Sequence, residues 1–98
     1  MAEELVFKAI DSLTEDEDDL WVLATIARHK VIRFRELYAE LREYAIPEYR
    51  IRKSFTSLLD KRLIVRVRRG SYTANMRAIL GKAMELLEAE EEKAAEFG

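Results

Sequence analysis

The stretch AIPEYRIRKSFTSLLDKR, residues 45–62, followed by LIVRVRRGSYTA, residues 63–74, decides the fold of this 98-residue chain. Pro47 has a fixed φ and lacks an N–H, so it suits the first position of a helix and ends the helix before it. After it, apolar residues recur at helical spacing on one face. They are Ile51, Phe55, Leu58 and Leu59. The sequence therefore predicts a helix over residues 47–62 with one buried face.

The opposite face of this predicted helix is basic and hydroxylated. At 100° per residue it collects one set of side chains, with Arg52 on its flank. The set is Tyr49, Arg50, Lys53, Thr56 and Ser57. Basic groups contact phosphates or guanine edges, and hydroxyls contact phosphates or bases, so these six residues are predicted to bind DNA. An ordinary solvated helix face has the same broad composition.

Residues 63–74 predict a short β-hairpin. Alternation over residues 63–68 places Leu63, Val65 and Val67 on one side of a half-buried strand. Residues 69–71 supply the turn and residues 72–74 a returning strand. The remaining predicted DNA contacts are the hairpin arginines Arg66, Arg68 and Arg69. Three arginines are costly in a core and useful against a phosphate backbone or a narrow minor groove.

The segments before this stretch predict three further helices and a small strand. Residues 3–13 carry an apolar stripe, and residues 20–28 are nearly apolar all round. Thr14 and Glu17 match a capping box, so the second helix should begin near residues 14–16. Residues 31–34 are β-branched and aromatic, which favours a small strand, and a helix over residues 35–44 follows.

This order of elements, over about residues 20–74, resembles the winged helix-turn-helix superfamily. The resemblance rests on several short segments of the chain. They are Phe34-Arg35-Glu36-Leu37, Ile46-Pro47, the buried face of helix 47–62, Leu63-Ile64, and Gly70 with Tyr72. It implies that helix 47–62 enters a major groove while residues 66–72, the wing, touch the backbone or minor groove. Arg62 departs from the pattern, because relatives often end this helix with glycine. The helix therefore ends one residue earlier or lacks a left-handed cap.

The two ends of the chain predict helices with exposed apolar stripes. Asn75 can cap a helix over residues 75–97, in which Gly81 weakens the helix or permits close approach of another. This helix and helix 3–13 could pack together within one chain or across a two-fold axis. The predicted dimerisation residues are Leu5, Ile10, Met76, Leu80, Ala83 and Leu87.

The net charge of −2 conceals a strong separation of charge along the chain. Residues 1–27 carry eight acids and one base, residues 28–69 carry thirteen bases and five acids, and residues 70–98 carry three bases and six acids. A basic block within an acidic chain favours a polyanionic partner. A solvated basic stripe is the alternative.

Composition excludes several classes of function. With no cysteine, a single histidine (His29) and three glycines, the chain offers no thiolate site, catalytic constellation or phosphate loop. We therefore expect no enzyme activity, cofactor, metal or small-molecule ligand. The longest apolar run, residues 20–27, is too short to span a membrane. The absence of glutamine suggests a thermophilic source. The absence of cysteine suggests an intracellular location.

Together these patterns predict one mainly α domain, residues 1–98, with a small β-hairpin: a winged helix-turn-helix core at 20–74 between terminal helices at 1–13 and 75–97. The predicted function is a homodimeric, nucleoid-associated, cytoplasmic regulator of transcription that binds double-stranded DNA. The alternative is a module that binds protein within a transcription, replication or membrane-remodelling assembly. RNA is a third possible partner, though no exposed aromatic series for base stacking is evident.

Overall fold

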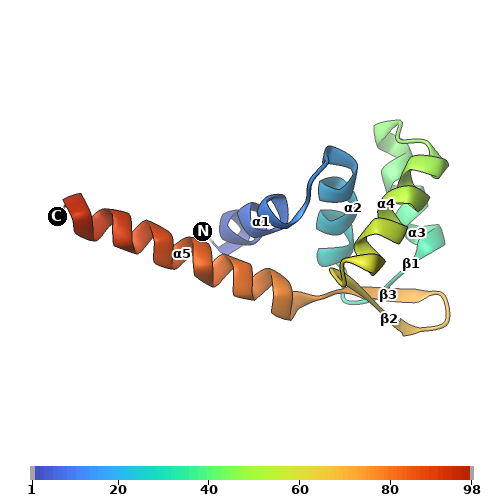
Figure 1. The fold of residues 1–98 in the computed structure, drawn as a ribbon. Helices are drawn as coiled ribbons and strands as arrows, with labels where there is room; N and C mark the ends of the chain where they lie inside the picture. The colour runs from blue at the N-terminus through green and yellow to red at the C-terminus, as the bar shows by residue number, and fades with distance from the viewer. Residues whose placement is uncertain (1, 98) are drawn as a thin grey trace.

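The computed structural model describes residues 2–97, so Met1 and Gly98 of the predicted domain lie outside the described residues. Within this range the chain forms five α-helices, one 3₁₀ turn and three strands (Figure 1). In chain order they are α1 (Ala2–Leu13), α2 (Glu17–Ala27), β1 (Ile32–Arg33), α3 (Phe34–Leu41), η1 (Arg42–Tyr44), α4 (Glu48–Asp60), β2 (Ile64–Arg68), β3 (Ser71–Ala74) and α5 (Met76–Phe97). The predicted class, mainly α with a small β-hairpin, is confirmed.

The three strands form one antiparallel sheet in the order β1-β3-β2. Ile32 of β1 pairs with Tyr72, and Ile64 of β2 pairs with Ala74, so β3 lies in the centre. A register shift between Arg66 and Arg68 marks a β-bulge in β2. Bulges increase the local twist of a strand, and this one precedes the hairpin turn.

The core is continuous from the sheet through α2 and α4 to the two terminal helices. Ile26 of α2 and Leu58 of α4 are fully buried at its centre. α1 packs along α5, and this contact adds Ala9 and Ile10 from α1 and Ala83 from α5 to the buried set. In Figure 1, α5 continues away from the rest of the molecule, and its C-terminus lies at the end opposite the β2–β3 hairpin.

The strand phase predicted for residues 63–68 is wrong. Leu63 and Ile64 are buried, whereas Val65 and Val67 are 46% and 51% exposed. Only the first residue of β2 lies over the core, because the hairpin then runs outward from the C-terminal end of α4 (Figure 1). Val65 and Val67 therefore lie on the surface with the hairpin arginines.

The start of α2 also differs from the predicted capping box. Asp16, not Thr14, is the N-cap, and its side chain accepts a hydrogen bond from the Asp19 amide at 2.8 Å. The Thr14 hydroxyl instead donates to the Ile10 carbonyl at 2.9 Å, at the end of α1. In this acid-rich segment several residues could cap, and the competing bond to α1 engages the threonine.

α4 ends in a left-handed cap that is occupied by arginine. Arg62 has φ 59°, its amide donates to the Leu59 carbonyl, and the Leu63 amide donates to the Leu58 carbonyl. These two bonds form a Schellman motif, in which glycine is the usual left-handed residue. Of the two endings expected for this helix, the one without a left-handed cap is wrong.

Candidate nucleic-acid interface

The exposed outer face of α4 carries four of the six residues predicted on this helix, namely Tyr49, Arg52, Lys53 and Thr56. Arg52 bonds Glu48 at 3.2 Å, and its guanidinium lies 4.4 Å from the centre of the Phe34 ring. Among residues 2–97, Lys53 has no ion-pair partner. The helix therefore presents one oriented guanidinium and one free ammonium to solvent.

Arg50 lies on another flank of α4, against the N-terminus of α2. Its guanidinium donates two hydrogen bonds to the Asp18 carboxylate, at 2.8 and 2.6 Å. These bonds lower the pKa of Asp18 and raise that of Arg50. Because both carboxylate oxygens are engaged, Arg50 holds α4 against α2 and does not join Lys53 on the outer face.

Ser57 lies on this same flank, together with Lys61. The Ser57 hydroxyl donates to the Asp19 carboxylate at 3.2 Å, and Lys61 Nζ lies 3.7 Å from the same oxygen. Asp19 is only 2% exposed, and a buried carboxylate needs partners. Ser57 supplies a hydrogen bond and Lys61 a positive charge. Arg50 and Ser57 thus position α4 against α2, and their contact with DNA stays a prediction.

The three hairpin arginines, Arg66, Arg68 and Arg69, are exposed, and none forms an ion pair within residues 2–97. Arg66 lies opposite Tyr72 in the sheet. Tyr72 packs edge-on against Phe55 of α4, with ring centres 4.4 Å apart. This contact fixes the hairpin relative to α4, so the arginines extend from a rigid base.

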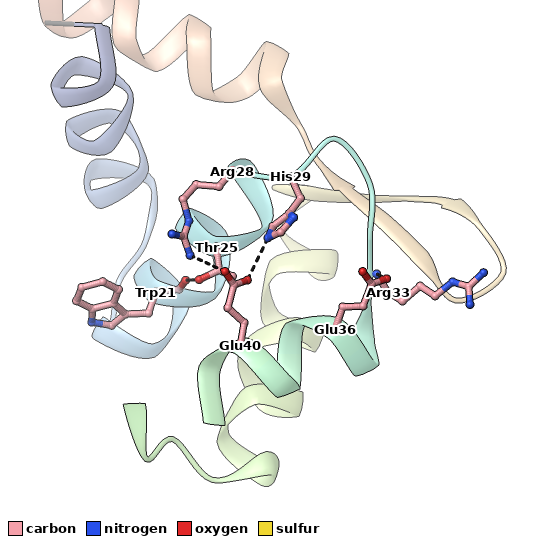
Figure 2. A network of polar contacts seen from close by, with 7 residues as sticks. All are labelled: Trp21, Thr25, Arg28, His29, Arg33, Glu36 and Glu40. Carbon is pink, nitrogen blue, oxygen red and sulfur yellow. Dashed lines mark hydrogen bonds and ion pairs between the residues drawn. The ribbon is translucent and has the colours of Figure 1, made fainter. Parts of the chain in front are cut away.

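Arg33 lies beside the hairpin, near Arg68, and was missed by the sequence reasoning. Arg33 of β1 and Arg68 of β2 both lie opposite Ser71, on either side of the central strand. Paired residues share a face of a sheet, so the two arginines flank Ser71. Figure 2 shows the Arg33 side chain extending toward the hairpin and away from Glu40. Pairing of the predicted strand 31–34 with the hairpin was the signal that could have revealed it.

Arg28 of the central block and the neighbouring His29 both contact Glu40, away from the hairpin. Glu40 of α3 accepts a hydrogen bond from Arg28 at 3.1 Å, and His29 Nε2 lies 3.0 Å from its other oxygen (Figure 2). These contacts join the C-terminal end of α2 to α3. Of the thirteen bases of the central block, four form ion pairs within residues 2–97. The other nine form none there, and three of these nine are the hairpin arginines.

An apolar groove of about 590 Å³ lies beside α1 and α2, apart from the hairpin. Phe7, Trp21, Tyr44 and Met76 are among its lining residues, and all four are partly exposed. The Trp21 and Tyr44 rings are stacked with centres 6.4 Å apart. Trp21 therefore lies at the surface of this groove.

The predicted dimerisation residues separate into three groups by burial. Ile10 and Ala83 are 2% and 4% exposed, because they pack between α1 and α5 within one chain. Leu5 and Leu87 are partly buried. Met76 and Leu80 are exposed on α5. Ile10 and Ala83 are thus core residues, which corrects their assignment to a surface for a second copy.

Comparisons of the chain with protein-family models, curated proteins and solved structures give no match. Among residues 2–97, no group of three or more histidine, cysteine, aspartate or glutamate side chains could hold a metal ion. None of the described helices is both long and apolar enough to cross a membrane.

Proposed function

We propose that the chain binds double-stranded DNA, as a homodimeric regulator of transcription, through the outer face of α4 and the β2–β3 hairpin. The observation that supports this most is the set of arginines free of ion pairs on the hairpin. Charged side chains in proteins commonly pair or disperse, and free guanidiniums gathered on an exposed hairpin suit the phosphate backbone.

The arrangement of elements agrees with the resemblance to the winged helix-turn-helix superfamily. β1 completes a three-stranded sheet beside the hairpin, and α3 and α4 meet across the turn at Ala45–Pro47. In this proposal α4 lies in the major groove, where Lys53 and Thr56 contact bases and Arg52 a phosphate or guanine edge. Arg33 and the hairpin arginines contact the flanking backbone.

Fluorescence anisotropy with a labelled duplex, measured over a range of salt concentrations, tests the proposal. If Arg33 and the three hairpin arginines each neutralise one phosphate, the slope of log affinity against log salt is about −3.6 per protomer and about −7 per dimer. Arg68→Ala with Arg69→Ala should reduce the slope by about 1.8 per protomer. Lys93→Ala, on the far part of α5, is the matched control and should leave the slope unchanged. A flat salt dependence would refute DNA binding.

A protein partner is the second candidate function, and the apolar groove lined by Trp21 and Tyr44 favours it. Exposed aromatic side chains beside a groove are typical of protein-binding surfaces. The same titration separates the two candidates, because a protein-binding module should show weak affinity for DNA and no loss on replacement of Arg68 and Arg69.

A further inference from the structure

Helix α5 carries two apolar stripes, and α1 covers only one of them. Ile79, Ala83 and Leu86 lie on the covered stripe and pack in the core or against it. The second stripe lies about 100° around the helix, at steps of four, four and three residues. It consists of Met76, Leu80, Met84 and Leu87. Leu80 and Met84 at its centre are 51% and 54% exposed.

The edge of this open stripe is suited to close approach of another helix. Gly81 lies beside Leu80, and a Cβ added there would meet no atom within 4 Å. Glycine destabilises an exposed helix interior relative to alanine, and nothing within residues 2–97 fills the space beside Gly81. The gap next to Gly81 can therefore accept a side chain from outside.

The charged residues on the same edge indicate that the approaching helix is α5 of a second copy of the chain. Arg77 lies near the start of the stripe and Glu88 near its end, and neither forms an ion pair within residues 2–97. A second α5 that runs antiparallel, with Arg77 opposite Glu88, brings both charges of each copy to opposite charges of the other. The same register places Gly81 opposite Met84. A two-fold axis requires this reciprocity, in which residue i meets j and j meets i.

We propose that two copies of the chain associate through an antiparallel pair of α5 helices centred between Gly81 and Met84, with reciprocal Arg77–Glu88 ion pairs. This inference rests on the homodimer of the proposed function and is independent of DNA. A stable interface buries about 800 Å² per partner. The open stripe supplies part of this area.

Charge reversal tests the register. Arg77→Glu places four glutamates at the two contacts, and Glu88→Arg places four arginines there. Each should weaken dimerisation roughly tenfold or more, because two attractive pairs become repulsive. The double variant should regain wild-type affinity, and an equimolar mixture of the two single variants should form a heterodimer. Lys93→Glu is the matched control and should leave the dimer unchanged.

Sedimentation velocity from about 1 to 200 μM protein measures these affinities, and far-UV circular dichroism checks folding. Neither single variant should unfold the chain. Arg77→Glu adds an acid to the first turn of α5, and Glu88→Arg adds a base within reach of neighbouring glutamates. A dimeric wild type that both reversals leave unchanged would overturn this register and leave the homodimer standing. A wild type that is monomeric throughout would overturn both, without bearing on DNA binding.

Discussion

Asn75 connects the three elements on which the proposed DNA surface depends. Its side-chain amide donates to the Arg62 carbonyl at 2.8 Å, and its side-chain oxygen accepts from the Ala78 amide at 3.2 Å. Its own amide donates to the Leu63 carbonyl. One residue therefore caps the start of α5, satisfies the left-handed end of α4 and closes the base of the hairpin.

Replacing Asn75 should lower the free energy of unfolding in two separable steps. Asn75→Ala removes the cap on α5, which costs about 1 kcal/mol, and the bond to Arg62, which costs about 1 kcal/mol more. Asn75→Ser retains an oxygen that can cap Ala78 but loses the amide donor, so it should cost about 1 kcal/mol. The backbone bond to Leu63 persists in both variants.

Urea denaturation followed by far-UV circular dichroism at one protein concentration measures both steps. The dependence of free energy on urea should stay constant, because the surface exposed on unfolding is nearly unchanged. Lys93→Ala, an exposed substitution remote from these bonds, is the control and should lie within about 0.5 kcal/mol of wild type. A loss below about 0.5 kcal/mol for Asn75→Ala, or equal losses for serine and alanine, would refute this division of roles.

Two further substitutions test local features of α4. Arg62→Gly should raise the free energy of unfolding by about 0.5 to 1 kcal/mol, because glycine adopts the left-handed cap without strain, whereas Arg62→Ala should leave it nearly unchanged. Equal effects of the two in chemical denaturation would contradict the strain. Asp18→Asn should destabilise the chain near pH 7. Arg50 lowers the pKa of Asp18 below its ordinary 3.8, so the contribution of the pair is present above that value and is lost as pH falls through the lowered pKa. Thermal melts of the two proteins should therefore converge in acid, and a difference that persists to pH 2 would exclude the ion pair as its cause.

The spacing of apolar residues predicted most of the fold. In a helix with one apolar face, that spacing shows which face is buried. The stripe through Ile51, Phe55 and Leu58 gave α4, and Pro47 gave its start. The phase of β2 was wrong because it was counted from Leu63. Which residues of β2 are buried depends on the left-handed turn at Arg62 and on the short distance over which the hairpin overlies the core.

The candidate site was less predictable because a helix has more than two faces. Spacing placed Arg50, Lys53 and Ser57 together on the polar half of α4. It could not show that α2 covers one flank of that half. At the start of α2, the Asp16 side chain accepts a hydrogen bond from the Asp19 amide and caps the helix. The contacts of Asp18 and Asp19 with α4 depend on tertiary packing, as does the burial of Ile10 and Ala83 between α1 and α5.

An acidic protein can bind a polyanion when its acids are either neutralised near the contact surface or distant from it, and this chain has both arrangements. Beside α4, Asp18 and Asp19 of α2 are engaged by Arg50 and Lys61, and Glu48 of α4 is engaged by Arg52. The acid-rich part of α5 lies at the opposite end of a molecule 49 Å long (Figure 1). Exposed charges are largely screened beyond about 8 Å at physiological ionic strength, so these distant acids repel DNA at the hairpin only weakly. The local balance of charge at the hairpin and the outer face of α4, and not the net charge of −2, therefore governs the proposed contact with DNA.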